Sequence, residues 1–341
     1  MATFVPPKFR KYFEPNLSPH AEVAERAALQ WARDMGLVCS ADAEERWRNA
    51  ENGVLAGYVA PLASAEMVTI LAQWGGLLFV LDDQYAEGRY TSAEGWRSAI
   101  LHLHRVMETA KVDPDEDSPA ARALADLVGR LYPRVRSAWR RRFAKHAWES
   151  FDAATAENAY RSLNRPPGIN EFVALRRPAS AMLPHLDVTE LASGSDLPPE
   201  IYDLEALQEL ILATTDIVAW SNDVASLEKE EACGEKCNFV LVLEHAEGLS
   251  REAAIDAVLG RVSERVEQYV ETERVVKHLI RREPREIREQ VDYVMHGFRS
   301  WIGGQEVWHE KAERFRSAAA GGTVEHITPL VFVADPGALA T

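Results

Sequence analysis

The chain has 341 residues, with 38 Lys and Arg against 53 Asp and Glu, and its formal net charge at pH 7 is −15. An acidic surface repels phosphate backbones, so this balance disfavours a nucleic-acid-binding protein. Hydrophobic residues make up 47% and charged residues 27% of the chain, which is typical of a folded soluble protein and excludes a disordered one.

The amino terminus predicts no targeting segment. Residues 1–8 lack the basic start and long apolar stretch of a signal peptide, and the longest unbroken apolar run, residues 74–81, is too short to span a bilayer. Three cysteines, Cys39, Cys233 and Cys237, cannot form a closed disulfide framework. Because no second Cys/His pair accompanies the last two, plain thiols are favoured over a zinc site. We therefore expect a cytoplasmic protein.

Hydrophobic spacing is helical along nearly the whole chain, as in the apolar stripe of Ala24, Ala28 and Trp31. Clusters of proline and glycine separate segments that are each long enough for a helix. An alternating strand pattern occurs only at residues 329–334. We predict an all-α fold of about ten helices in a single domain over residues 1–320, followed by a loosely ordered tail over residues 321–341.

The first candidate site lies where an apolar helix ends in carboxylates. Residues 79–87 read Phe-Val-Leu-Asp-Asp-Gln-Tyr-Ala-Glu, so Glu87 follows Asp83 by four residues and shares its helical face. Carboxylates such as Asp82 and Asp83 are unfavourable near a helix C-terminus, where the macrodipole is negative, and a cation should compensate them. A metal site and a solvated acidic helix end both fit this segment taken alone.

The second candidate site is a polar stripe further along the chain. Asn222, Ser226 and Glu230 are spaced i, i+4, i+8, so the three side chains project from one helical face. An amide oxygen, a hydroxyl and a carboxylate suit Mg²⁺, which takes its remaining ligands from water and phosphate. An exposed polar stripe is the alternative, but Asn and Ser are poor interior helix formers and such a face would favour Glu, Lys and Gln.

In this order and about 140 residues apart, the two segments resemble the two metal motifs of bacterial class I terpene synthases, also called terpene cyclases. The resemblance runs from about Trp31 to Phe315. Arg176, 46 residues before Asn222, stands where that family places its diphosphate-sensing arginine. Residues 237–240 match the family's segment beyond the second metal motif.

The carboxyl-terminal part of the chain carries a further match. Trp308 is followed six and seven residues later by Arg314 and Phe315, which resemble the family's tryptophan and Arg-Tyr pair. Phe315 departs from the family, since it lacks the hydroxyl that would bond the diphosphate. Ala179 and Ser180 stand at the linker and effector positions of the family's induced-fit trigger. The linker is usually more polar, so we expect a softer trigger here.

The resemblance implies a single-domain class I terpenoid synthase-like helical bundle around a deep active-site cavity. It also implies an Mg²⁺-dependent lyase, with three ions, that ionises a linear prenyl diphosphate, cyclises the carbocation and releases diphosphate. The implied metal ligands are Asp82, Asp83, Glu87, Asn222, Ser226 and Glu230. The implied substrate-binding residues are Arg176, Lys229, Arg314, Phe315, Phe79 and Trp308, and the implied catalytic residues are Arg176, Ser180 and Arg314.

The chemistry itself explains these residue types. A diphosphate leaves only when its charge is neutralised, which Mg²⁺ and hydrogen-bond donors can do together. The resulting carbocation needs a dry cavity with electron-rich walls. The aromatic residues nearest the motifs are candidates for that wall, although each could equally be core packing: Phe79, Phe172, Trp220, Trp301 and Trp308.

Farnesyl diphosphate, a C15 substrate, is the base expectation for a bacterial-type chain of this size. Leu77, Leu78 and Leu81 occupy positions where family members often carry aromatics, so geranylgeranyl diphosphate (C20) is an alternative. Chain-building prenyltransferases are disfavoured because their second motif is Asp-rich. A non-catalytic acidic helical interaction module explains the charge but not the Asn-Ser-Glu spacing. A homodimer stays open as an alternative to a monomer.

Overall fold

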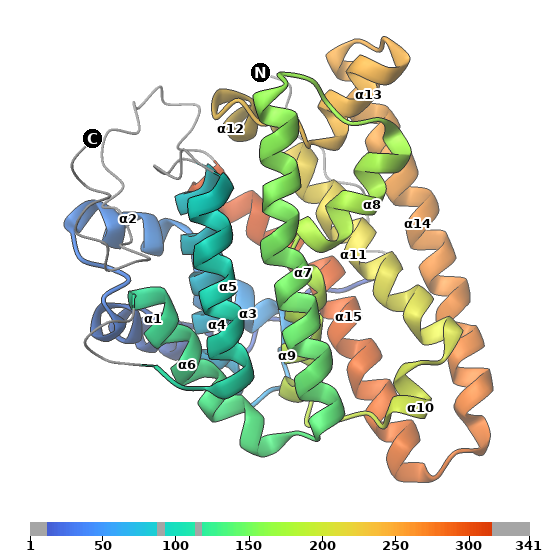
Figure 1. The fold of residues 1–341 in the computed structure, drawn as a ribbon. Coiled ribbons are helices and arrows are strands. Elements are labelled where there is room, and N and C mark those ends of the chain that lie inside the picture. Colours follow the sequence, from blue (N-terminus) through green and yellow to red (C-terminus); the bar gives the residue numbers. More distant parts are fainter. Residues whose placement is uncertain (1–11, 87–92, 113–117, 316–341) are drawn as a thin grey trace.

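The computed structural model describes residues 12–86, 93–112 and 118–315. Within these ranges the chain is helical and has no β-strand, which confirms the predicted all-α fold. The strand-like residues 329–334 and the predicted domain boundary at residue 320 lie outside the described residues. Figure 1 shows long helices side by side in a bundle, with α12 and α13 at one end and α10 at the other.

The first half of the chain forms shorter helices and the central apolar one: α1 (Ala21–Met35), α2 (Ala41–Asn49), α3 (Asn52–Val59), α4 (Ala65–Ala86), α5 (Ala93–Thr109), α6 (Pro119–Leu131) and the 3₁₀ turn η2 (Tyr132–Arg134). The second half supplies the longest helices: α7 (Ser137–Ser162), α8 (Ile169–Ala179), α9 (Met182–Ala192), α10 (Pro199–Tyr202), α11 (Glu205–Ala225), α12 (Leu227–Ala232), α13 (Phe239–Glu247), α14 (Arg251–Leu279), η3 (Ile280–Arg282), α15 (Arg285–Lys311) and η4 (Glu313–Phe315).

The prediction of about ten helices is wrong, because fifteen α-helices occur within the described ranges. One or two irregular residues divide segments that hydrophobic spacing alone reads as continuous. Ser180 and Ala181, the latter with φ of 54°, separate α8 from α9, and Ser226 lies between α11 and α12. Ser226 is neither a glycine nor a proline, so it gives no breaker signal in the sequence.

Helix α9 lies at the centre of the bundle and packs against α4, α11 and α15, and α11 also packs against α15. Helix α4 is apolar on nearly all sides, which is typical of a buried helix. Its stretch Ala65–Asp83 is long and apolar enough to cross a membrane by length and composition, but two-thirds of that stretch is buried inside the bundle. Among the described helices it is the one that passes this test, and its burial indicates a core helix.

Two adjacent glycines bring α15 close to the amino-terminal part of the chain. A Cβ atom at Gly303 would lie 2.6 Å from the carbonyl oxygen of Phe13, and one at Gly304 would lie 2.7 Å from the Cβ of Tyr58. Side chains at these positions would push α15 away from α3. The glycines thereby set the position of the helix that carries Trp308.

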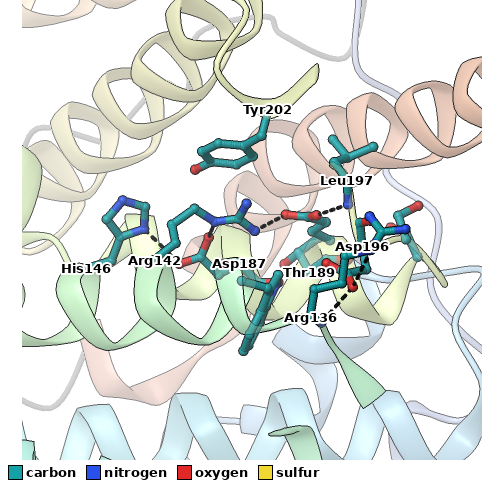
Figure 2. Close-up of polar contacts among 12 residues, drawn as sticks. Arg136, Arg142, His146, Asp187, Thr189, Asp196, Leu197 and Tyr202 are labelled. Atoms are coloured by element: carbon teal, nitrogen blue, oxygen red, sulfur yellow. Dashed lines mark hydrogen bonds and ion pairs between the residues drawn. The ribbon is translucent and has the colours of Figure 1, made fainter. Parts of the chain in front are cut away.

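A buried ionic cluster fixes α9 against α7 and α10, as Figure 2 shows. Arg142 of α7 donates from Nε to Asp187 Oδ1 over 2.7 Å, pairs with Glu190, and lies 3.6 Å above the ring of Tyr202. His146 Nδ1 lies 2.7 Å from Asp187 Oδ2. Because both carboxylates belong to α9, the cluster holds the carboxyl-terminal half of that helix.

This cluster predicts a pH-dependent stability. Burial raises the pKa of Glu190 from its ordinary value of 4.5 to about 8, despite donors such as Arg142. Between pH 4.5 and about pH 8, Glu190 holds a proton in the native state that it has released in the unfolded chain. The free energy of unfolding therefore falls as pH rises through this range. Glu190→Gln keeps the shape but does not titrate, and we expect a flatter profile between about pH 5 and about pH 8. Urea denaturation followed by circular dichroism checks this. Parallel profiles for variant and wild type would contradict it.

Candidate active site

Asp82 of the first predicted motif and all three residues of the second line one cavity of about 120 Å³. Helices from both halves of the chain contribute to its wall, and their side chains are mostly charged or polar. The lining residues are Phe79 and Asp82 from α4, Glu157 and Arg161 from α7, Arg176 and Ala179 from α8, Asn222, Ser226, Lys229, Glu230, Cys233, Glu235, Cys237 and Arg314. Residues about 140 positions apart in the sequence therefore meet in space.

The acidic end of α4 is compensated by cations, as the helix macrodipole argument requires. Arg314 donates from Nη1 to Asp83 Oδ2 and from Nη2 to Asp83 Oδ1, each over 2.8 Å, and from Nη2 to Asp82 over 3.1 Å. Lys229 Nζ lies 3.3 Å from Asp83 Oδ1. Burial opposes ionisation of Asp83, but Arg314 and Lys229 outweigh it and hold the pKa of that carboxyl well below its ordinary value. Asp83 is therefore an anion in this site.

The Asn-Ser-Glu stripe crosses the junction of α11 and α12. Its spacing survives the break, because the Ser226 N–H donates to the Asn222 carbonyl over 2.7 Å and the Glu230 N–H to the Ser226 carbonyl over 2.9 Å. Ser226 Oγ lies 2.7 Å from Glu230 Oε1, and Asn238 Nδ2 donates to Glu230 Oε2 over 2.9 Å. Burial raises the pKa of Glu230 to about 7. The stripe faces the cavity and not the solvent.

Arg176 ties α8 to this stripe. Its Nε donates to Asp223 Oδ1 over 2.8 Å, and its Nη2 donates to Asn222 Oδ1 over 3.3 Å. Asp223 has no exposed surface, and its second oxygen accepts from the Phe239 N–H over 3.2 Å. The arginine therefore contacts both a predicted metal ligand and that ligand's buried neighbour.

Ser180 lies at the turn between α8 and α9 and is not among the lining residues. Its Oγ donates to the Arg177 carbonyl over 2.8 Å, and its N–H donates to the Arg176 carbonyl over 2.9 Å. Ala179, at the predicted linker position, does line the cavity.

The aromatic candidates divide into two groups. Phe79 lines the cavity, stacks on Trp308 with ring centroids 5.7 Å apart, and lies 4.5 Å from the Arg314 guanidinium. Trp308 Nε1 donates to the Ala50 carbonyl over 2.8 Å. Phe172 and Trp220 instead pack on Phe239, and Trp301 packs edge-on against His185. Of the five candidates, Phe79 is the one among the lining residues of this cavity.

Several lining residues were not predicted. Glu157 and Arg161 lie four residues apart on α7, and Arg161 pairs with Glu235, which follows α12. Burial, reinforced by the neighbouring Glu235, raises the pKa of Glu157 well above its ordinary value. The i, i+4 spacing near the end of a long helix was the available signal, but such pairs are common on exposed helices.

The described residues do not include the side chains of two predicted site residues. Glu87 lies outside the described residues, and Phe315 is described only as the last backbone position of η4. In the described ranges no three His, Cys, Asp or Glu side chains group as a metal site. The donors present are two carboxylates on α4 and an amide, a hydroxyl and a carboxylate on the facing wall. Such hard oxygen donors fit a divalent cation that also takes ligands from water and substrate.

Known proteins resemble this chain in sequence and in fold. A family model described as "Terpene synthase family 2, C-terminal metal binding" matches residues 73–268. The (+)-T-muurolol synthase ((2E,6E)-farnesyl diphosphate cyclizing) of Roseiflexus castenholzii is 30% identical over 307 residues, covering 89% of this chain and 91% of that protein. Pristinol synthase of Streptomyces pristinaespiralis is 29% identical over 320 residues, covering 91% and 86%. The structure of wild-type cucumene synthase superposes with a TM-score of 0.77 at 25% identity, covering 88% of this chain and 98% of that one.

Proposed function

Because the chain belongs to terpene synthase family 2, whose carboxyl-terminal part binds metal, we propose that it is an Mg²⁺-dependent sesquiterpene synthase. It would ionise farnesyl diphosphate, cyclise the carbocation and release diphosphate. The observation that carries this proposal is the convergence of Asp82, Asn222, Ser226, Glu230 and Arg176 on one cavity. An acidic interaction module would need no such convergence.

The metal would be held by Asp82 and Asp83 on one wall and by Asn222, Ser226 and Glu230 on the other, with three ions expected. When bound, Mg²⁺ supplies the positive charge that neutralises the diphosphate leaving group.

The cationic side chains around the cavity have a second role toward the substrate. Arg176, Lys229 and Arg314 carry N–H donors that can bond diphosphate oxygens. Arg314 and Lys229 donate to Asp83 in this structure, and their N–H groups would turn to the substrate if Asp83 held a metal ion. The face of Phe79 offers an electron-rich wall to the carbocation. No side-chain base is assigned for deprotonation; the released diphosphate can accept the proton.

Substrate length follows from the relatives. The name of the Roseiflexus relative specifies farnesyl diphosphate as the substrate that it cyclises. The comparisons fit the C15 substrate and not the C20 one.

The deciding experiment is incubation of the purified protein with geranyl, farnesyl or geranylgeranyl diphosphate and Mg²⁺, with products read by gas chromatography–mass spectrometry. We expect C15 terpenes from farnesyl diphosphate and far less product from the other two. Preferential turnover of the C20 substrate would overturn the substrate assignment. The absence of any product from all three would overturn the enzymatic function.

Ligand binding gives an independent test. Because Mg²⁺ takes ligands from the diphosphate and the diphosphate takes donors from the protein, we expect the two together to raise the melting temperature more than the sum of their separate effects. Differential scanning fluorimetry with MgCl₂, sodium diphosphate and both measures this. Ca²⁺ with diphosphate is the control for ionic strength. Strictly additive shifts would count against a shared site.

A further inference from the structure

A second polar site lies deeper in the bundle, among α3, α4, α9 and α15. Asn52 is only 2% exposed, yet neither its Oδ1 nor its Nδ2 has a hydrogen-bond partner within the described residues. Buried amides are normally bonded, so an unpartnered one indicates a group that the protein alone does not supply. Asn52 begins α3, which packs on both α4 and α15.

His185 presents an acceptor to the same place. Its Nδ1 lies 2.9 Å from the Ala181 carbonyl, which can only accept, so Nδ1 carries the hydrogen and Nε2 of the neutral ring carries a lone pair. Nε2 has no hydrogen-bond partner in the described part of the chain. The ring is held edge-on by Trp74 and Trp301, with centroids 6.2 Å and 5.2 Å away.

Gly75 shows where these atoms meet. A Cβ atom built at Gly75 would lie 3.7 Å from His185 Nε2 and 4.0 Å from Asn52 Oδ1, with no other neighbour within 4 Å outside the helix's own backbone. Both polar atoms therefore face one point beside the backbone of α4. That point is kept open by the missing side chain.

The helical register fixes the depth of this point relative to the acidic cavity. Gly75 precedes Phe79 by four residues and Asp83 by eight, so it lies on their side of α4. Along the helix axis, toward the amino terminus of α4, Gly75 is about 6 Å from Phe79 and about 12 Å from Asp83. On α15, Trp301 lies seven residues, or two turns, before Trp308. A prenyl chain anchored at Asp83 and running along this face would bring its far carbons to Gly75.

We propose that Asn52 and His185 bind a water molecule that captures the carbocation, so that the main product is a sesquiterpene alcohol. This proposal rests on the proposed function above. Because Nε2 and Oδ1 are both acceptors, a water molecule bonded to them donates both of its hydrogens and directs its lone pairs elsewhere. Such a water is oriented as a nucleophile toward the bundle interior.

Atoms and charge are conserved in the capture of the carbocation by water. A lone pair of the water oxygen forms a C–O bond to the cationic carbon, which gives a protonated alcohol. That oxonium group, a much stronger acid than imidazolium, transfers one proton to His185 Nε2. The products are the neutral alcohol and an imidazolium, and the imidazolium loses its proton to solvent when the product leaves. No oxidant or reductant is involved.

Three variants test the site. Gly75→Ala places a methyl group at the shared point, His185→Phe keeps the ring shape without Nε2, and Asn52→Leu removes the amide. Gly129→Ala is the matched control, because a Cβ there meets nothing within 4 Å. Each variant is incubated with farnesyl diphosphate and Mg²⁺ in H₂¹⁸O. Circular dichroism melts establish which variants are folded, and Gly75→Ala tests the site even where a larger change does not fold.

We expect the wild type and Gly129→Ala to release a C15 alcohol carrying ¹⁸O. In the three site variants we expect the alcohol share to fall by about tenfold in favour of hydrocarbons, with total substrate consumption within about threefold of wild type. A wild type that forms only hydrocarbons, or an unchanged alcohol share in Gly75→Ala and His185→Phe, would overturn the water site. A wild type that consumes no prenyl diphosphate would instead overturn the proposed function.

Discussion

Replacement of Asn222 and Ser226 by alanine is expected to lower Mg²⁺-dependent turnover by about 10³-fold or more, because it removes two of three donors from one wall of the metal site. The helical fold should persist, because these two side chains make few contacts beyond the α11–α12 junction. Those contacts are the ones from Asn222 to Arg176 and His309. Product formation from farnesyl diphosphate measures activity, and circular dichroism measures the fold. Asp82→Ala, on the opposite wall, should have the same consequence.

Glu228→Ala is the matched control for these ligands. Glu228 lies on α12 between Ser226 and Glu230 but is exposed and does not line the cavity. Its loss changes the net charge near the site without removing a donor, so turnover should stay close to wild type. If Asn222→Ala/Ser226→Ala and Asp82→Ala both kept wild-type turnover, the metal assignment would be wrong.

Arg176→Met is expected to cost about 3–5 kcal/mol of unfolding free energy and to abolish turnover. The methionine keeps the apolar stem but leaves Asp223, which has no exposed surface, without its charged partner, and a buried carboxylate that loses its cation is strongly destabilising. Arg176 also offers N–H donors to the diphosphate, so the variant removes a substrate contact at the same time. Urea denaturation and product analysis report these two effects separately.

The adjacent Arg177 provides the control for this variant. It also pairs with a buried carboxylate of α11, but Asp216 keeps a second cation, since Arg265 Nε donates to it over 3.0 Å. Arg177 is also partly exposed to solvent. We therefore expect Arg177→Met to cost only about 1 kcal/mol and to retain turnover. Equal losses of stability and activity in the two variants would show that position 176 has no special role.

The sequence predicts which polar side chains meet at the cavity because their placement depends on local periodicity. Asn222, Ser226 and Glu230 share a face wherever the backbone is helical, and Asp83 lies at the end of an apolar run. The requirement for a nearby cation followed from the same local argument, and Arg314 and Lys229 meet it. The family resemblance supplied the pairing of two segments that periodicity treats separately.

The remaining features depend on tertiary contacts that no local pattern encodes. The pairing of Arg161 with Glu235 joins α7 to the segment after α12, and each residue alone reads as ordinary surface charge. Trp220 and Trp301 lie near the motifs in sequence, but they pack on Phe239 and His185 and are not among the lining residues of the acidic cavity. The extra helices arise from single residues such as Ala181, whose left-handed backbone is set by its surroundings and not by its own preference.

The ionic cluster on α7 also determines how α9 can move. Asp187 and Glu190 anchor one end of this helix through Arg142, whereas its other end begins directly after the left-handed Ala181. A helix anchored in this way can tilt about its fixed end but cannot slide along its axis without breaking the buried Arg142–Asp187 ion pair and the hydrogen bonds of Glu190. If Arg176 moves on ligand binding, the backbone change would therefore occur at the α8–α9 turn. His185, one turn into α9, would then move perpendicular to the helix axis, while the carboxyl-terminal half of α9 keeps its position.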